Sequence, residues 1–316
     1  MSWQASLFCI FLRWTIKRAS AGPIDVAKAR ASINKPRRRT RRIAPGFAVS
    51  AVHVDGLVFE HIDRAAAPAL RQDRAILYLH GGGYIFCSPQ SHRPITLAMA
   101  AHADAPVWAL DYRLAPEHKL PAALDDAIAA YRWLAAAEPA RRIVLAGDSA
   151  GGGLALATAI ALRDLAPELP PPIALVLFSP WADLGGTGGS NISNEKSCAM
   201  FTNAMIKQAG QLYLGAAEPA DPRASPLFGN LHDLPPMQIF ASADELLLDD
   251  SRRLAAKAHA EGVTVDLHIV PGVPHVWPLF ARFLPEGRAT LLQVRDFLKR
   301  LMVSPNLRAA PPPPAG

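Results

Sequence analysis

Short apolar runs recur along the chain from about residue 50 onward, and segments with a helical period separate them. The runs do not alternate apolar with polar positions, which is typical of strands buried on both faces of a parallel sheet. Strands are therefore expected at residues 75–79, 106–110, 142–146, 173–178, 237–241 and 265–270.

Helical patterns occupy the intervals between these runs. One begins with Asp249 and Asp250, which are expected to cap it, and stops at Gly262, a residue type that often ends helices. Alternating strands and helices indicate an α/β fold with a mostly parallel sheet. Helices are expected at residues 122–136, 150–164, 249–261 and 287–302.

Two regions interrupt this alternation, one at the N-terminus and one rich in Gly, Ser, Asn and Pro with weaker helical character around residues 203–214. An insertion that lies over the strand ends would form a lid. A chain of 316 residues suits one large domain. The expected parts are an N-terminal cap segment (1–48), a core (49–182 and 231–303), a cap insertion (183–230) and a disordered proline-rich tail (304–316).

Apolar residues recur at helical spacing near the N-terminus. We expect an amphipathic helix whose apolar face packs on the body of the protein, with peripheral membrane contact as the alternative. Neither a signal peptide nor a membrane-spanning stretch is expected, because Arg13 ends the apolar run. The residues of this face are Trp3, Leu7, Ile10, Phe11 and Trp14.

The net charge of +6 is concentrated between residues 28 and 42. Such a stretch could meet nucleic acid or anionic lipid, but a solvated loop beside Pro36 is the simpler interpretation. No nucleic-acid-binding motif accompanies it, so no nucleic-acid partner is expected.

The three cysteines, Cys9, Cys87 and Cys198, are widely spaced and form no C-x-x-C motif. This usage predicts reduced thiols in a cytoplasmic protein, with neither a disulfide framework nor a metal site.

The pentapeptide from Gly147 to Gly151 matches G-x-S-x-G and lies between a predicted strand and a predicted helix. In that context the sharp turn exposes the oxygen of Ser149 near the positive end of the helix, so Ser149 is predicted to be a nucleophile. Asp148 is expected to organise this turn or a neighbouring loop.

A run of three glycines follows His80 at the end of an earlier predicted strand. Acyl transfer creates a negatively charged oxygen that backbone N–H groups must approach, and glycine permits that approach. The N–H of Ala150 is the first expected donor to this oxyanion. Gly82 and Gly83 are the preferred further donors, and Gly81 is an additional candidate.

The motifs HGGG and GDSAGG, with DYRLAPEHKLPAALDD (111–126) between them, resemble those of the hormone-sensitive-lipase-like family of α/β-hydrolases, whose bacterial members are carboxylesterases. The resemblance covers roughly residues 45–303. It implies an eight-stranded sheet, a helical cap built from the N-terminal segment and an insertion, and hydrolysis of short-to-medium acyl esters without a cofactor. Related enzymes are often dimers, which makes a homodimer possible.

His275 is the expected base for the serine. It follows the last predicted strand, and the chain order serine, acid, histidine is the one expected for this fold. The acid is less certain from the residues alone. The family usually reads D-P-L-x-D after the preceding strand, and an alignment without gaps places Glu245 at the first Asp, with Asp244 as the alternative.

Other residues near these motifs have simpler interpretations. Asp111, Arg113 and Glu117 are expected to form a structural network rather than to react. Four apolar residues could line the acyl or alcohol pocket, with core packing an equal alternative: Phe86, Trp181, Met200 and Phe201.

The same triad serves lactone hydrolysis and removal of an N-acetyl group, which are the alternatives within enzymes. A non-catalytic ligand receptor on the same fold is a remote alternative, because such receptors lack the histidine that His275 supplies here.

Overall fold

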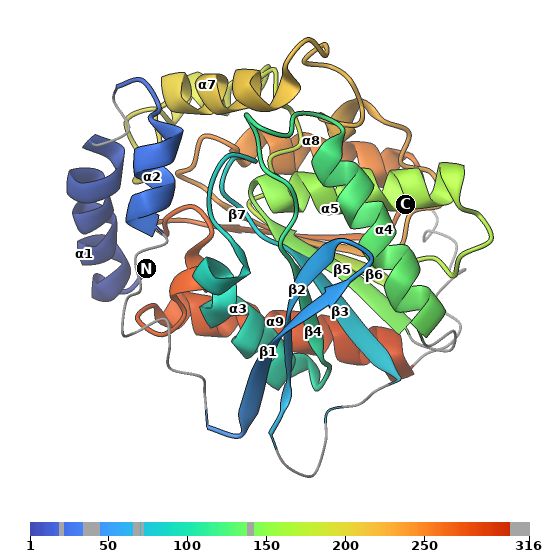
Figure 1. The fold of residues 1–316 in the computed structure, drawn as a ribbon. Coiled ribbons are helices and arrows are strands. Elements are labelled where there is room, and N and C mark those ends of the chain that lie inside the picture. The colour runs from blue at the N-terminus through green and yellow to red at the C-terminus, as the bar shows by residue number, and fades with distance from the viewer. Residues whose placement is uncertain (19–21, 34–44, 66–69, 71–72, 138–141, 304–316) are drawn as a thin grey trace, which may run out of the picture.

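A single eight-stranded sheet forms the centre of the molecule in the computed structural model (Figure 1). The structure describes all residues except 19–21, 34–44, 66–69, 71–72, 138–141 and 304–316. The strands are β1 (Phe47–Val54), β2 (Leu57–Arg64), β3 (Arg74–Leu79), β4 (Val107–Leu110), β5 (Arg142–Asp148), β6 (Ala174–Phe178), β7 (Met237–Ser242) and β8 (Val265–Val270).

The strand order is β1-β2-β4-β3-β5-β6-β7-β8. The strands β3 to β8 pair in parallel, whereas β1 and β2 pair antiparallel and β2 joins β4 antiparallel. The six strands predicted as apolar runs are confirmed within a few residues at each end.

Helices cover both faces of the sheet, as the two apolar clusters of the core show. One cluster joins Leu77 and Leu79 of β3 to α4, α5 and α8, and the other joins Ile76 and Tyr78 of the same strand to α3 and α9. The helices are α1 (Trp3–Leu12), η1 (Arg13–Lys17), α2 (Val26–Ile33), α3 (Pro89–Ala103), α4 (Ala122–Ala137), α5 (Ala150–Leu165), α6 (Ser190–Ser193), α7 (Asn203–Leu214), η3 (Pro226–Phe228), α8 (Leu248–Ala260), η4 (Trp277–Phe280) and α9 (Pro285–Val303).

The hairpin of β1 and β2 was not among the strands read from apolar runs. Every residue of β1 is exposed or half-buried, so that strand lacks a continuous apolar run. Asp55 and Gly56 form the turn, with φ of 49° and 80°. An Asp-Gly pair in this conformation is a strong hairpin signal and could have located both strands.

The predicted packing of the N-terminal helix is wrong. Helix α1 forms, but it turns Ala5, Cys9 and Leu12 toward the protein. Because α1 is apolar on most sides, helical spacing could not decide which side packs, and the small Ala5 and Cys9 allow a close approach. The five residues predicted to pack are instead 48–71 % exposed: Trp3, Leu7, Ile10, Phe11 and Trp14.

The N-terminal segment and the region 183–230 meet above one end of the sheet, where α2 and α7 lie near each other (Figure 1). The N–H of Ile24 donates to the side-chain oxygen of Gln208 in α7 at 3.0 Å. The predicted disorder of residues 304–316 lies outside the described residues, as does most of the basic stretch between residues 28 and 42.

Candidate functional site

The predicted site residues gather at the carboxyl ends of the parallel strands. Ser149 directly follows β5, Glu245 lies in the loop after β7, and His275 lies in the loop after β8. Ligands of α/β sheets bind at this end of the strands, because loops from several strands converge there.

Ser149 occupies a strained turn between β5 and α5. Its φ of 52° and ψ of −122° lie outside the favoured regions for a residue with a side chain. Glycines make the turn possible: a Cβ on Gly151 would collide with the carbonyl oxygen of Leu79, and one on Gly147 would collide with Gly151. The side chain of Ser149 is therefore held at the start of α5, where the helix dipole favours negative charge.

His275 pairs with Glu245 in the interior. The Nδ1 atom of His275 lies 2.6 Å from Oε2 of Glu245, and both side chains are buried. The other carboxylate oxygen, Oε1, accepts the N–H of Ser242 at 3.1 Å. With Nδ1–H donated to the carboxylate, Nε2 of His275 is left as the acceptor, and it has no hydrogen-bond partner among the described residues.

Asp244 has a different task. Its Oδ2 atom accepts the N–H of Gly272 at 2.6 Å, and its own N–H donates to the hydroxyl of Ser242 at 3.1 Å. The carboxylate of Asp244 thus ties the β7 loop to the β8 loop, and it is Glu245 that meets the imidazole of His275.

The end of β6 links the serine to the histidine loop. The N–H of Ser149 donates to the carbonyl of Phe178 at 2.9 Å. The next residue, Ser179, accepts the N–H of Val276 on its hydroxyl at 3.2 Å. Main-chain and hydroxyl contacts therefore fix the spacing between the loops that carry Ser149 and His275.

The glycine loop after β3 is bent at two positions that favour glycine, with φ of 119° at Gly82 and 61° at Gly83. The N–H of Gly81 donates to Asp148 Oδ1 at 3.1 Å, so it is occupied and does not fit the oxyanion role expected for it. Among the described residues, no hydrogen bond engages the N–H of Gly82 or Gly83. Ala150 is the first residue of α5, a position whose N–H has no acceptor within the helix.

Asp148 is the centre of a buried polar cluster behind the serine. Besides the N–H of Gly81, its carboxylate accepts the hydroxyl of Tyr78 at 2.7 Å and lies 3.2 Å from Nε2 of His92. Burial alone would lower the pKa of His92, but the charge and hydrogen bond of Asp148 raise it overall. Burial likewise opposes ionisation of Asp148, yet His92 and Tyr78 hold its pKa below the usual value.

Tyr78 and His92 were missed as site residues, because they come from β3 and α3 and carry no local motif. The expected organising role of Asp148 is visible in these contacts. His80 belongs to the same region: burial lowers its pKa to about 3, and its ring stacks on Tyr112 with a centroid distance of 4.3 Å. The hydroxyl of Tyr112 donates to the carbonyl of His80 at 2.6 Å and so fixes the start of the glycine loop.

The segment around α6 braces the loop that carries Glu245. The amide of Asn194 donates to the carbonyls of Ala243 and Glu245 at 3.0 and 2.9 Å. Ser197 donates to the carbonyl of Asp244 at 3.1 Å. Sequence patterns gave no signal for these contacts, since the partners are about 50 positions apart.

The predicted capping of α8 by Asp249 and Asp250 is wrong, because Leu247 is the N-cap residue. Both carboxylates turn away from the helix end instead. Asp250 accepts the N–H groups of Ala182 and Asp183 at 2.9 Å, while Asp249 accepts that of Ser190 at 2.9 Å. Burial and the neighbouring Asp183 raise the pKa of Asp250 well above its usual value.

The candidate pocket residues lie in different surroundings. Phe201 is half-buried, and its ring meets that of His275 edge-on with a centroid distance of 5.2 Å. Trp181 is buried in the apolar core that contains the helices α4 and α5. Phe86 and Met200 are half-buried. Two of the four therefore contact the triad candidates: the ring of Phe201 meets His275, and the main-chain N–H of Trp181 donates to the carbonyl of Ser149 at 2.9 Å.

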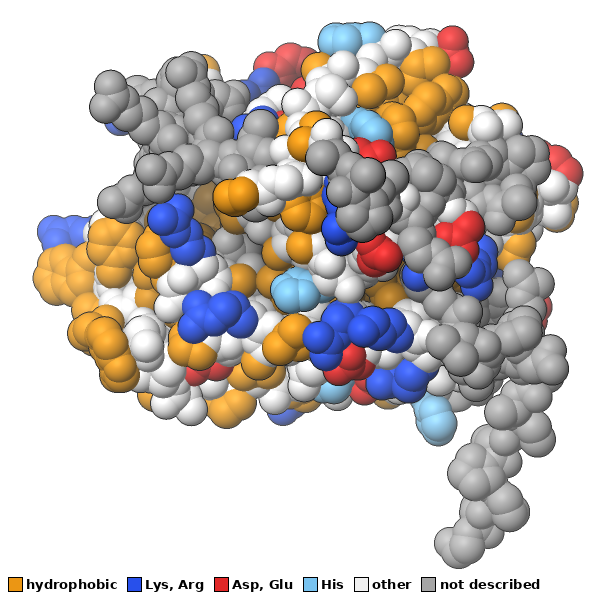
Figure 2. Space-filling model, turned by 90° about the horizontal axis from the view of Figure 1, so that it is seen from below, with side chains coloured by type: hydrophobic (Ala, Val, Ile, Leu, Met, Phe, Trp, Pro, Cys, Tyr) orange, Lys and Arg blue, Asp and Glu red, His pale blue; other side chains and the backbone are white. Residues whose placement is uncertain are grey.

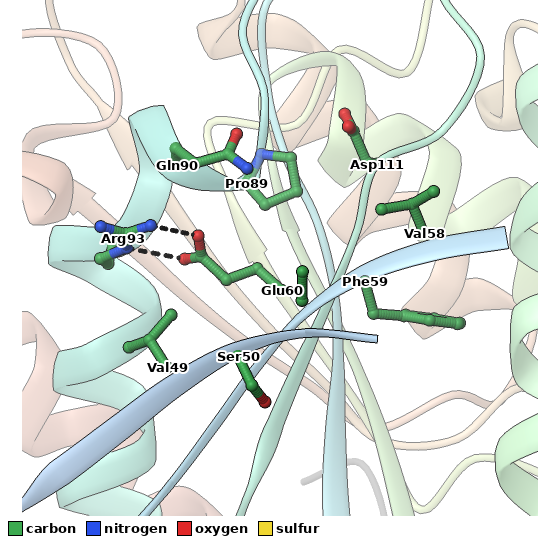
Figure 3. A pocket seen from close by; sticks show the side chains of 10 residues that line it. Val49, Ser50, Val58, Phe59, Glu60, Pro89, Gln90, Arg93 and Asp111 are labelled. Carbon is green, nitrogen blue, oxygen red and sulfur yellow. Dashed lines mark hydrogen bonds and ion pairs between the residues drawn. The ribbon is translucent and has the colours of Figure 1, made fainter. Parts of the chain in front are cut away.

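A separate hollow of about 150 Å³ lies at the β1–β2 edge of the sheet (Figure 3). An ion pair between Glu60 and Arg93, 2.5 Å between charged atoms, forms part of its wall (Figure 3). Asp111 also borders it, while Arg113 and Glu117 pair elsewhere, with Asp126 and Arg30 respectively. This hollow contains none of the predicted site residues, so it is not the candidate active site.

A serine at a strained strand–helix turn, with a histidine paired to a carboxylate after the later strands, is the arrangement typical of α/β-hydrolases. Within the part of the chain that the structure describes, no three His, Cys, Asp or Glu side chains come together as metal ligands would.

Comparisons with known proteins agree with this class. The profile of a family described as alpha/beta hydrolase fold matches residues 76–279. An acetyl-hydrolase of Streptomyces hygroscopicus is 42 % identical over 233 residues, which cover 73 % of this chain and 77 % of that protein. Esterase LipU of Mycobacterium tuberculosis is 38 % identical over 240 residues, covering 73 % and 80 %.

The crystal structure of an esterase from the bacterial hormone-sensitive lipase family is also similar, with a TM-score of 0.87 and 36 % identity over 96 % of this chain and 99 % of that one. The chain therefore belongs to the α/β-hydrolase family, and within it to the hormone-sensitive-lipase-like esterases, a group of carboxylic ester hydrolases.

Proposed function

We propose that the protein hydrolyses esters of short-to-medium carboxylic acids through an acyl-enzyme on Ser149, with His275 as the base and Glu245 as the acid of the triad. The buried contact between His275 and Glu245, at 2.6 Å, is the observation that carries this proposal. It holds the imidazole in the tautomer that can accept a proton on Nε2.

In the first step, His275 removes the proton of the Ser149 hydroxyl while the oxygen attacks the ester carbonyl. The carbonyl oxygen becomes negatively charged, and the N–H groups of Gly82, Gly83 and Ala150 stabilise it. His275 then gives the proton to the leaving alcohol, and the acyl group remains on Ser149. Glu245 stabilises the positive charge that the imidazole carries in between.

In the second step, water takes the place of the alcohol. His275 removes its proton, the resulting hydroxide attacks the acyl-enzyme, and Ser149 leaves with the proton returned by His275. The products are the free acid and the regenerated serine.

A small acyl group is supported by the similar protein from Streptomyces hygroscopicus, which is named an acetyl-hydrolase. A panel of p-nitrophenyl esters of increasing chain length, a lactone and an N-acetyl compound separates ester hydrolysis from the two alternatives. We also propose that residues 1–48 and 183–230 form the cap over the site, a division that the contact between Ile24 and Gln208 supports.

The nucleophile is tested by Ser149→Ala. We expect the variant to lose essentially all turnover of a water-soluble acetyl ester, because it lacks the oxygen on which the acyl-enzyme forms. Rapid mixing of the wild-type chain with the ester should give a burst of alcohol equal to the enzyme concentration if deacylation is slower. Substantial turnover by the alanine variant, with an unchanged circular dichroism spectrum, would show that Ser149 is not the nucleophile.

A further inference from the structure

The outward side of α1 is a feature that the proposed reaction leaves unused. Its apolar residues point away from the protein, although α1 packs its opposite side on the body. Phe283 lies next to them, since the ring of Phe8 stacks with those of Phe11 and Phe283 at centroid distances of 6.1 and 6.5 Å. The α1 patch is defined as Trp3, Leu7, Ile10, Phe11, Trp14 and Phe283, all of them exposed.

The patch is continuous enough to be seen on the surface. Hydrophobic side chains gather at the left edge of Figure 2, the side on which α1 lies in Figure 1. A helix that is apolar on both sides needs a second apolar environment besides the protein core. Scattered apolar residues need no such explanation, but an exposed cluster of four aromatic and two large aliphatic side chains does.

Charge distinguishes between the possible partners. From Met1 to Ile24 the sequence contains Arg13, Lys17 and Arg18 and no acidic residue. Arg13 and Arg18 are exposed, and the guanidinium of Arg18 lies 5.7 Å from the ring centre of Trp14. An apolar face edged by cations fits a lipid surface with anionic headgroups, where Trp and Phe enter the interface and Arg meets phosphate.

A second copy of the chain fits less well. A twofold contact would place the same patch of each copy face to face. Such a contact would take the exposed Arg13 and Arg18 out of water, although no acidic residue occurs between residues 1 and 24 and Glu286, the carboxylate at the start of α1, already binds Ser2.

The position of α1 connects the patch to the candidate active site. The Sγ atom of Cys9 lies 3.8 Å from the carbonyl oxygen of Gly272, in the loop that carries His275. Arg13 donates to the carbonyl of Ser197 at 2.8 Å, shortly before Phe201, whose ring touches that of His275. The α1 patch thus borders the loops at the active site.

We propose that α1 lies on an anionic lipid surface, with the α1 patch in the interface and Arg13 and Arg18 at the headgroups, so that the esterase takes its substrates at that surface. The uptake of substrates at the surface rests on the proposed ester hydrolysis, whereas the binding of α1 to lipid does not. None of the helices in the described residues combines the length and apolar character needed to cross a bilayer.

The test is sedimentation of the full chain with vesicles of phosphatidylcholine that contain phosphatidylglycerol, compared with pure phosphatidylcholine. We expect the wild-type chain to bind the anionic vesicles, to bind the neutral ones more weakly, and to be partly released by salt. Trp3→Gln combined with Phe11→Gln should weaken binding at least about tenfold, because two large apolar side chains no longer enter the interface.

The matched control replaces two apolar residues exposed elsewhere, Leu165→Gln with Leu292→Gln, and should bind as the wild type does. Every variant is also assayed on a water-soluble acetyl ester, where the patch variant should keep the wild-type rate. The patch variant that binds both vesicles like wild type, or a wild-type chain that binds neither, overturns the inference. A wild-type dimer that becomes monomeric in the patch variant, without vesicle binding, assigns the patch to a second copy and also overturns it.

Ser149→Ala separates this inference from the proposed function, since it should bind vesicles normally while hydrolysing no ester. Vesicle binding by a wild-type chain that lacks esterase activity would contradict only the proposed function. Esterase activity without vesicle binding would contradict only the lipid-surface inference.

Discussion

Two adjacent carboxylates, Asp244 and Glu245, have separate tasks although they share one loop. Glu245 meets the imidazole of His275, whereas Asp244 accepts the main-chain N–H of Gly272. The longer side chain reaches inward from the β7 loop to the ring, and the shorter one fastens the loop that carries the ring. A glutamate at this position therefore fits the geometry.

The paired substitutions Glu245→Gln and Asp244→Asn test this division. Glu245→Gln should reduce kcat by about 10³–10⁴, because a neutral amide neither fixes the tautomer of His275 nor stabilises its charge. Asp244→Asn should reduce kcat much less and chiefly lower the free energy of unfolding. Steady-state kinetics and urea denaturation of both variants measure the difference, and a larger kinetic defect in Asp244→Asn would reverse the assignment.

At the scale of single residues, the sequence predicted those that belong to motifs but not the residues that hydrogen-bond to them. The serine, the histidine and the glycine loop each lie in a local pattern tied to a strand end. The partners of Asp148 could not be predicted, because Tyr78 and His92 approach it from β3 and α3 only after the chain folds. The hydrogen bond from the N–H of Gly81 could not be predicted for the same reason, since no local pattern shows that Asp148 turns toward it.

The crossing of α5 over β3 is a close contact between two backbones at the site. A Cβ on Gly151 would collide with the carbonyl oxygens of Leu79 and His80, both backbone atoms that cannot turn aside. Close approach of the helix start to the strand is what places Ser149 beside the glycine loop.

Gly151→Ala should therefore lower the free energy of unfolding by about 3 kcal/mol or prevent folding, as overpacking against backbone does. Gly189→Ala is the matched control, since that glycine has φ of −62° and a Cβ there would meet only ordinary contact with Asp249. Urea denaturation of the two variants should differ clearly. Equal stabilities would mean that α5 can shift away from β3 without cost.

Apolar runs located the strands β3 to β8, including the half-buried edge strand β8, but they did not locate β1 and β2. A central strand or helix is recognised by its apolar run because both faces meet the core. β1 is partly exposed along its whole length, and α1 is apolar on nearly all sides, so neither burial pattern could be deduced from spacing.

The N-terminal segment is fastened to the loops of the active site by charged contacts. The ammonium group of Lys17 donates to the carbonyls of Glu195 and Cys198, the latter at 2.9 Å. Both carbonyls belong to the segment that also braces the Glu245 loop through Asn194. The segment around α6 therefore holds both the N-terminal segment and the loop that carries Glu245.

Lys17→Met keeps the aliphatic stem and removes the charge, so it should lower the free energy of unfolding by about 2 kcal/mol, the typical value for charged hydrogen bonds to buried partners. Lys207→Met, at an exposed position of α7, is the control and should change stability little. Urea denaturation of both variants measures the contribution. Matching curves for the two would show that Lys17 does not couple the N-terminal segment to the site.

The carboxylate of Asp148 has a consequence for how the whole site moves. It adjoins the nucleophile in the chain and holds the N–H of Gly81, at the head of the glycine loop. The hydrogen bond of Asp148 therefore joins the end of β5, which carries the attacking oxygen, to the end of β3, which carries the proposed oxyanion pocket. We therefore expect thermal motion of the sheet to move both together, and to change their separation less than motion of the outer layers changes the entrance to the site. Warming would then alter how substrate enters well before it misaligns the reacting groups.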